Sequence, residues 1–242
     1  MPAVRNTLNL WRQELGDVPE SVWERTELEV LILADTGLTA LPPDIGRLHR
    51  LKILDLGHNA LSAVPEEIGS LTELSDCLYL HDNALSRLPD SLGRLNRLRY
   101  LNVGENRLTI LPDTIGAMTG LIELRAQHNR LTALPDSLGS LRCLRELWLR
   151  GNAIEDLPSS TAQLRELRHL DLRENALSEV PAPLAGLPRL RQIDLRSNRL
   201  RRLPDWIARM PSLEKLDLRW NEVDPSLPLV GELERLGCVV LT

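Results

Sequence analysis

The sequence predicts an α/β repeat solenoid, and three regularities of the 242-residue chain indicate it. Asparagine recurs every 23 residues, with one spacing of 24, in the frame Leu-x-x-Asn-x-(Leu/Ile/Val), with Val or Ala in place of the leucine in two units. A Leu-x-Leu pair or a close variant precedes each asparagine, and a Leu-Pro or Val-Pro pair follows at a fixed distance after every asparagine except the last. A unit this small cannot bury its own apolar face, so neighbouring units must stack for the chain to fold. The eight asparagines are Asn59, Asn83, Asn106, Asn129, Asn152, Asn175, Asn198 and Asn221.

The first half of each unit predicts one short β-strand. Side chains alternate between the two faces of a strand, so both leucines of Leu-x-Leu point to the core and the residue between them points outward. The asparagine amide can both donate to and accept from the backbone of the following turn, and stacked copies predict a ladder of such bonds. Parallel sheets are normally covered on both faces, so the uncovered outer face is the default binding surface.

The second half of each unit predicts a short helical or 3-10 segment. Proline blocks a continued strand ladder, and the following (Ile/Leu)-Gly-x-Leu places apolar residues three apart. One position in this segment is always small, and we interpret it as tight packing between units rather than as a ligand site. The column reads Gly46, Gly69, Gly93, Gly116, Gly139, Ala162, Ala185 and Ala208.

The unbroken period predicts a single domain over residues 1–242. Thr36 and Gln13 occupy the asparagine position in two earlier units, which gives ten units in all. The outer edge of the first unit is expected to be bare or cut from a longer protein, and the closed far end indicates that the chain ends where the protein ends. We expect an N-terminal capping repeat over 5–27, regular repeats over 28–221, and a C-terminal cap with a helix and a last strand over 222–242.

One extra residue interrupts the period. Ser75, Asp76 and Cys77 stand where other units have two residues, which accounts for the single spacing of 24. Insertions of this kind are usually accommodated as a bulge. A tolerated insertion is the simpler interpretation, and a feature that re-aims Tyr79 and His81 for binding is the alternative.

The unit over residues 121–143 resembles the leucine-rich repeat family. Its Leu-Pro-x-x-(Ile/Leu)-Gly-x-Leu half, also present at Leu41-Pro42 and Leu88-Pro89, is similar to the 23-residue class of Scribble, Erbin, the plant intracellular Ras-group proteins and many bacterial proteins. The resemblance covers about residues 5 to 225. It implies a horseshoe with a concave parallel β-sheet and short helical or 3-10 segments on the convex side. Because the family binds so many partners, the resemblance says little about function.

The outward strand positions fall into three zones: small or aliphatic in the first units, aromatic in the middle, and alternating Asp and Arg in the last four. Exposed aromatic residues on a rigid sheet are the types that dominate interface energetics. We therefore predict a partner-contacting patch, with isolated aromatics that merely cover the strands as the alternative. The predicted partner-binding residues are Tyr79, His81, Tyr100, Arg125, Trp148, Arg150, Arg173 and Trp220.

The Asp and Arg residues of the last units form a grid of opposite charges. Asp and Arg lie two apart on each strand, and each Arg also neighbours an Asp on the next strand. Such pairs neutralise each other at little net gain. The functional alternative is that some Arg forks grip a carboxylate or phosphate of a partner. Arg150 is the best candidate for a guanidinium group without an acidic partner, because the residue two before it is Trp148 rather than Asp.

A further column, just before the asparagines, carries metal-ligand types: His58, Asp82, Glu105 and His128. No motif such as H-E-x-x-H supports a metal site, so we expect a solvated polar edge and no metal or other cofactor. Phosphate-binding, nucleophile-elbow and Cys-based signatures are absent from the sequence. We therefore predict no catalytic residues and no enzyme activity.

Composition adds a prediction about location. A net charge of −5 does not favour nucleic acid, and there is no apolar run of 18 residues or visible signal peptide. The three cysteines, Cys77, Cys143 and Cys238, are scattered without C-x-x-C spacing, which fits a reducing compartment. The 27 arginines against two lysines suggest either the codon bias of a GC-rich genome or a functional preference for Arg. We expect a cytoplasmic, bacterial protein, with export as an effector left open.

The leading hypothesis is a non-enzymatic interaction module or scaffold that binds a protein or peptide on its concave face. The first rival is a recognition domain that serves a kinase, GTPase or ubiquitin ligase. The second is self-assembly through the concave face or the bare first strand. We expect a monomer rather than a homo-oligomer, without nucleic-acid binding or membrane insertion.

Overall fold

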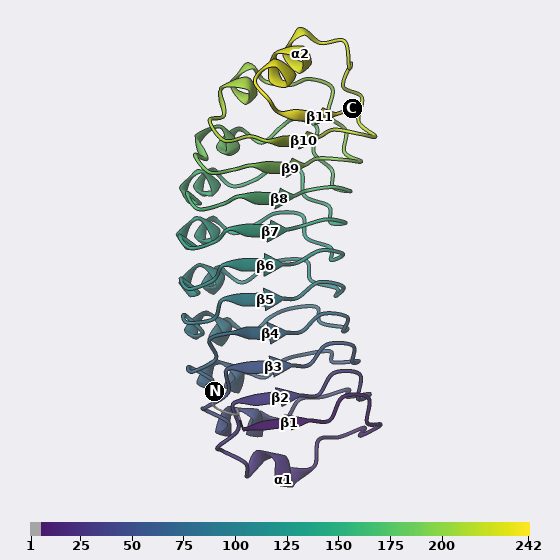
Figure 1. Cartoon of the computed structure of the whole chain (residues 1–242). Helices are drawn as coiled ribbons and strands as arrows, with labels where there is room; N and C mark the ends of the chain where they lie inside the picture. Colours follow the sequence, from purple (N-terminus) through teal and green to yellow (C-terminus); the bar gives the residue numbers. More distant parts are fainter. Residues whose placement is uncertain (1–5) are drawn as a thin grey trace.

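The computed structural model describes residues 6–242, which form one eleven-stranded parallel sheet whose strands follow chain order (Figure 1). The predicted solenoid is therefore confirmed. Residue 5, where the predicted capping repeat begins, lies outside the described residues. The strands are β1 (Thr7–Asn9), β2 (Val30–Ile32), β3 (Ile53–Asp55), β4 (Cys77–Tyr79), β5 (Tyr100–Asn102), β6 (Glu123–Arg125), β7 (Glu146–Trp148), β8 (His169–Asp171), β9 (Gln192–Asp194), β10 (Lys215–Asp217) and β11 (Val239–Leu241).

Short helical segments lie opposite the strands, one in each unit. Each 3-10 helix starts after a proline, which is extended before every one of them except η7, because proline ends the strand ladder and presets the backbone for a turn. The 3-10 helices are η1 (Pro43–Arg47), η2 (Glu66–Ser70), η3 (Asp90–Arg94), η4 (Asp113–Ala117), η5 (Asp136–Ser140), η6 (Ser159–Gln163), η7 (Ala182–Gly186) and η8 (Asp205–Arg209). Two α-helices, α1 (Glu20–Trp23) and α2 (Pro228–Arg235), take this place in the terminal units.

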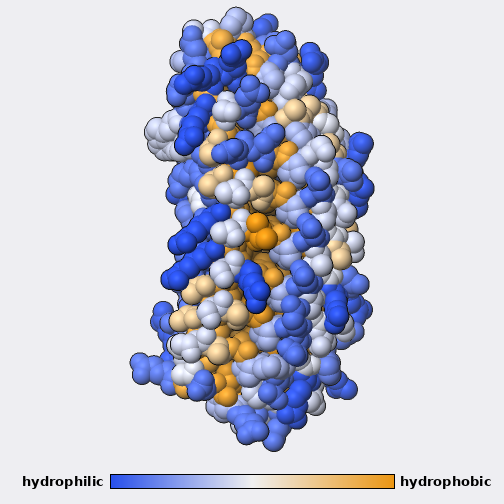
Figure 2. All heavy atoms as spheres, turned by 180° about the vertical axis from the view of Figure 1, so that it is seen from behind, coloured by the Kyte–Doolittle hydropathy of each residue, from blue (hydrophilic) through white to orange (hydrophobic). Residues whose placement is uncertain are grey.

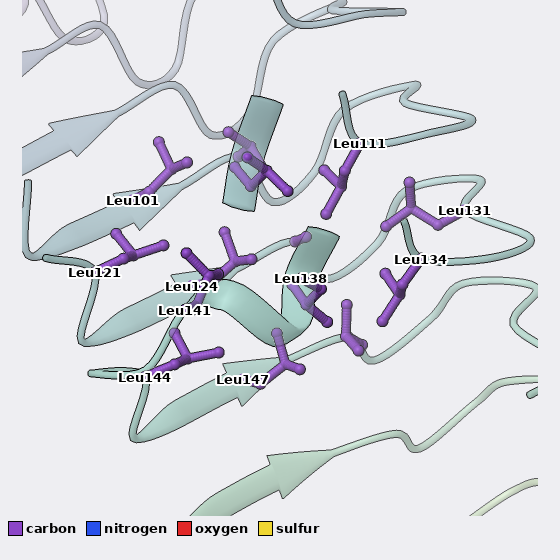
Figure 3. Close-up of a cluster of buried hydrophobic side chains, with 14 of the residues drawn as sticks. Leu101, Leu111, Leu121, Leu124, Leu131, Leu134, Leu138, Leu141, Leu144 and Leu147 are labelled. Atoms are coloured by element: carbon purple, nitrogen blue, oxygen red, sulfur yellow. The ribbon is translucent and has the colours of Figure 1, made fainter. Parts of the chain in front are cut away.

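Leucine fills the space between the strands and the helical segments. In the middle of the stack, Leu124 and Leu147 from the strands and Leu138 from η5 are fully buried and point toward one another (Figure 3). The same positions of every unit join into one continuous apolar core. No unit could bury these side chains alone, so each unit depends on its neighbours in the stack.

The side of the molecule seen from behind carries both polar and apolar side chains (Figure 2). Apolar side chains form a band along the stack between hydrophilic columns (Figure 2). Ile110, beside the buried Leu111 of a Leu-Pro segment, is 63% exposed and borders a groove along the Leu-Pro flank. It provides an exposed apolar reference position away from the strand face.

The small-residue column packs the helical segments together. A Cβ atom added at Gly116 of η4 would lie 2.3 Å from the carbonyl oxygen of Ser137 in η5. Real Cβ atoms do not approach backbone oxygen so closely, so glycine is required by the contact between units. The interpretation as tight packing is confirmed.

The asparagine ladder is also formed. The Asn129 side chain is buried, accepts from the N–H of Leu108 at 2.9 Å and donates to the carbonyl oxygen of Val103 at 2.9 Å. The residue before each ladder position has a positive φ. This backbone conformation is uncommon outside tight turns, so the chain turns sharply here in every unit. These residues form a turn edge beside the sheet: Arg12, Asp35, His58, Asp82, Glu105, His128, Gly151, Glu174, Ser197 and Trp220.

The extra residue before β4 is absorbed without moving the strand. The N–H groups of Arg99 and Tyr100 bond separately to Ser75 and Asp76, whereas in the next unit two N–H groups share the carbonyl oxygen of Arg99. The strand register is continuous, with Tyr79 in line with Asp55 and Asn102. The insertion therefore does not re-aim Tyr79 relative to the neighbouring strands.

The two ends of the stack differ. At the first unit Leu8 and Leu10 are only half-buried, and Gln13 is exposed. At the other end Val230 and Leu233 of α2 are buried, and β11 pairs with β10. The helix and last strand predicted for the C-terminal cap are both present.

Candidate functional site

A continuous row of ring and guanidinium contacts crosses strands β4 to β8. The ring centroids of Tyr79 and Tyr100 are 5.1 Å apart. The Arg125 guanidinium lies 5.6 Å from the Tyr100 centroid and 5.1 Å from that of Trp148, whose ring is 4.3 Å from that of His169. We call these five residues the ring row.

Strand geometry places the ring row on the outer face. Tyr79, Arg125 and Trp148 are the last residues of their three-residue strands, and Tyr100 and His169 are the first. Both positions face away from the buried leucine in the middle of the strand. All five side chains are half-buried, because each is covered by the neighbour in the row. Their outward direction agrees with the sequence prediction, but their mutual contact adds packing that the prediction did not include.

Carboxylates border the ring row. Glu123 accepts a hydrogen bond from Arg125 Nε at 2.6 Å, and Glu146 accepts one from Trp148 Nε1 at 3.3 Å. Burial raises the pKa of Tyr79 and of Tyr100, so both phenol groups remain protonated at neutral pH and can donate to a ligand. The surface combines apolar rings with donors and acceptors at fixed places.

The predicted Asp and Arg grid is present at the C-terminal side of the ring row. Each Arg bonds to the Asp on its own strand, and the bonds from Arg196 and Arg219 are 2.6 and 2.7 Å long. Arg196 also lies 3.4 Å from Asp217 on the next strand. The Asp171 and Asp217 side chains are only 2% and 3% exposed. The grid members are Asp171, Arg173, Asp194, Arg196, Asp217 and Arg219.

Replacement of Arg196 by alanine should therefore lower the free energy of unfolding by about 1–2 kcal/mol, because it removes the bridge between two carboxylates that have little access to water. Arg201→Ala is the matched control. Its pair with Glu222 is exposed on both sides, and such pairs contribute under about 0.5 kcal/mol. Urea denaturation of the two variants measures the difference. Equal losses would contradict a structural role for the grid.

The prediction that the Arg150 guanidinium has no acidic partner is wrong. Its Nε and Nη2 atoms lie 3.0 and 2.7 Å from Oε1 of Glu174. The bond from Arg150 lowers the pKa of Glu174. Glu174 belongs to the turn edge of the next unit, not to the strand columns from which the prediction was made. The turn rather than the strand supplies the partner.

The other three predicted residues lie in three different places. Arg173 belongs to the grid, and Trp220 lies on the turn edge with φ 60°, 69% exposed, beside the guanidinium of Arg219 at 5.5 Å. His81 contacts Tyr79 at 5.9 Å and His58 at 4.6 Å between ring centroids. His169 was not among the predicted site residues, although it occupies an outward strand position that the sequence pattern could have identified.

The described residues contain no group of three His, Cys, Asp or Glu side chains arranged to hold a metal ion. In the turn-edge column that carries metal-ligand types, His58 Nδ1 lies 2.8 Å from Asp82 Oδ2, an ordinary hydrogen bond. Within residues 6–242, no helix has the length and apolar character needed to cross a membrane.

Three family models match the chain, and all describe leucine-rich repeats. A leucine-rich repeat region matches residues 137–239, and two leucine-rich repeat models match residues 76–131 and 50–71. No curated protein sequence matches the chain.

Solved structures of similar fold include a leucine-rich repeat protein of Leptospira interrogans, with 25% identity and a TM-score of 0.67 over 100% of this chain and 78% of that one. The ectodomain of the Arabidopsis thaliana receptor kinase GASSHO1/SCHENGEN3, in complex with Casparian strip integrity factor 2, has 28% identity and a TM-score of 0.77 over 90% of this chain. The plant peptide hormone receptor RGFR1 in complex with RGF2 has 26% identity and a TM-score of 0.54 over 92%. The chain spans 27% and 45% of those two receptor chains.

Proposed function

The chain belongs to the leucine-rich repeat family, and from this premise we propose that it is a non-enzymatic interaction module that binds a protein or peptide on the open, concave face of its sheet. The ring row is the observation that carries the proposal. It joins two tyrosines, a tryptophan, a histidine and an arginine into one surface at the middle of the stack. Tyr, Trp and Arg are the residues most often found at the energetic centre of protein interfaces.

The chemistry of the ring row suits a peptide-like ligand. Flat rings offer apolar area that is already ordered by mutual contact, so little conformational entropy is lost on binding. The tyrosine hydroxyls can donate to backbone carbonyl groups, and Glu123 and Glu146 can accept from N–H groups. The two plant receptor structures contain bound partners, one a receptor for peptide hormones, which supports this use of the fold.

The surroundings of the ring row define its limits. On the C-terminal side the Asp and Arg grid satisfies its own charges, and Arg150 is held by Glu174. Desolvating these paired charges would gain little affinity. We therefore place the binding centre on the ring row, with Trp220 and Arg173 outside it.

Tyr100→Ala and Trp148→Ala should each weaken binding of a genuine partner by about 2 kcal/mol or more, because a truncated central aromatic loses both packing and water exclusion. Arg196→Ala should cost under about 1 kcal/mol of binding energy. The partner is first captured by pulldown with the intact protein against the Trp148→Ala variant, and isothermal titration calorimetry then measures each affinity.

Ile110→Ala is the matched control, since it removes an exposed apolar side chain away from the strand face. Circular dichroism must show that every variant is folded, because the ring-row side chains are half-buried. Weaker binding for Arg196→Ala, with normal affinity for Tyr100→Ala and Trp148→Ala, would move the site to the grid and overturn the proposal.

Self-assembly is a second candidate, favoured by the edge strand β1 and by Trp11 beside it, which is 53% exposed. A strand at the edge of a sheet can pair with a second chain. Light scattering at two protein concentrations distinguishes the candidates, since only self-assembly raises the mass with concentration.

We also propose a cytoplasmic location. The three cysteines lie in different units, Cys143 has an exposed free thiol, and such a thiol is typical of a reducing compartment. Fractionation of the source cells would test this.

A further inference from the structure

Two histidines from adjacent units meet at the N-terminal end of the open face. Nε2 of His58 lies 3.2 Å from Nε2 of His81, and their rings are inclined by 79° with centroids 4.6 Å apart. Zn–N bonds are about 2.0–2.1 Å long, so two imidazole nitrogens on one tetrahedral ion lie about 3.3 Å apart. The two Nε2 atoms are already at the separation that a shared metal ion requires.

A carboxylate fixes the chemical form of His58. Asp82 Oδ2 lies 2.8 Å from Nδ1, so Nδ1 carries the proton and donates to the carboxylate. The lone pair of His58 is then on Nε2, which faces His81. Metal-binding histidines almost always donate their other N–H group in this way, and the carboxylate makes the ring a stronger ligand.

Packing fixes the position of His81. A Cβ atom added at Gly57 would lie 2.5 Å from Cε1 of His81, so the glycine provides the space in which the ring sits. Tyr79 contacts the ring from its own strand. Nδ1 of His81 is buried and has no hydrogen-bond partner among the described residues. When Nε2 presents its lone pair to a ligand, the ring proton is on Nδ1, where no group of the described residues accepts it.

The nitrogen pair is open to the solvent and lies in a negative environment. His58 and His81 line a shallow hollow of about 360 Å³, whose other walls include Trp11, Ile32 and Asp55. The carboxylates of Asp55 and Asp82 attract a cation without occupying the space between the two nitrogens. An ion can therefore enter from the open face.

We propose that His58 and His81 form a two-imidazole site for a borderline divalent cation of the Zn(II), Ni(II) or Cu(II) class. Imidazole ligands suit these ions, whereas Mg(II) and Ca(II) prefer oxygen. The remaining coordination positions are filled by water or by a side chain of a bound partner. In the metal-free protein Nε2 of His81 donates its proton to Nε2 of His58, and when an ion binds this proton moves to Nδ1 of His81. The inference does not rest on the proposed function, because the two histidines alone supply the site.

The test uses the full chain with Cys143→Ser in every variant, so that the exposed thiol does not bind the ions. Isothermal titration calorimetry with Zn(II) and with Ni(II) should show one site per chain. His58→Ala and His81→Ala should each weaken binding at least about 10-fold, and Asp82→Asn about 10-fold. Electron paramagnetic resonance of the Cu(II) form should show two nitrogen ligands that are lost in His58→Ala and in His81→Ala.

His128→Ala is the matched control, since His128 occupies the same turn-edge position as His58, three units further along. This variant should bind the ions with unchanged affinity. Circular dichroism confirms that the variants fold. Unchanged affinity in His58→Ala or in His81→Ala, or an equal loss in His128→Ala, would overturn the proposal. Because the ions are added without a partner, this outcome is independent of partner binding.

Discussion

Asn129→Ala should lower the free energy of unfolding by about 3 kcal/mol. The side chain is buried and bonds to four backbone groups, those of Leu108, Val103, Ala126 and Gln127. Alanine leaves the N–H of Leu108 without an acceptor, and a buried unsatisfied donor costs about 1–3 kcal/mol. The three carbonyl oxygens each lose a donor as well, and the turn loses the bonds that hold His128 at φ 52°. Urea denaturation followed by circular dichroism measures the loss.

Gln13→Ala is the matched control at the end of the ladder. Gln13 occupies the same position in the first unit but is exposed, so water replaces whatever its amide contributes. The expected loss is under about 0.5 kcal/mol. Equal losses at Asn129 and Gln13 would contradict the ladder and the description of the first unit as a loosely packed end.

Gly116→Ala should lower the free energy of unfolding by about 2–3 kcal/mol. The new methyl group would meet the Ser137 carbonyl oxygen at 2.3 Å and the Ser137 Cβ at 2.8 Å. Relief requires η4 and η5 to move apart, which separates the buried leucines of two units, and overpacking of this kind typically costs about 1–3 kcal/mol. The carbonyl is backbone and cannot swing away as a side chain could.

Gly186→Ala is the control for this variant. Gly186 also lies in a 3-10 helix, but a Cβ atom there meets only the Cβ of Ala162, at 4.0 Å. Alanine restricts the unfolded chain more than glycine does, so this variant should be neutral or more stable by about 0.4–1 kcal/mol. A similar destabilisation at both glycines would show that backbone conformation, not contact between units, explains the small-residue column.

The fold and the direction of each strand side chain were predictable because both depend on a period. A repeated Leu-x-Leu fixes which residues are buried, and stacking fixes which residue lies beside which in the next unit. The register Arg125 to Trp148 and Trp148 to Asp171 follows from counting 23 residues. The aromatic zone was found by the same count.

Contacts between a strand residue and a residue of the turn edge could not be predicted from the 23-residue period. Glu174 reaches Arg150 from the turn edge, and His58 reaches His81 from the same edge. Each depends on a positive φ in the turn, which directs the side chain toward the neighbouring unit. The half-burial of the ring row likewise depends on the rotamers of its members, which a period does not specify.

The sequence by itself determined the solenoid, its leucine core, the asparagine ladder and the set of outward residues, because each is a property of position within a repeated unit. Only the tertiary structure decided which outward groups are partnered. In the structure Tyr79, Tyr100, Arg125, Trp148 and His169 contact one another in one row. Arg150 bonds to Glu174, and the Nε2 atoms of His58 and His81 lie 3.2 Å apart. The physical reason is that burial of the core leucines depends on the period of the chain, whereas contacts between outward side chains depend on turn conformation and rotamers in adjacent units.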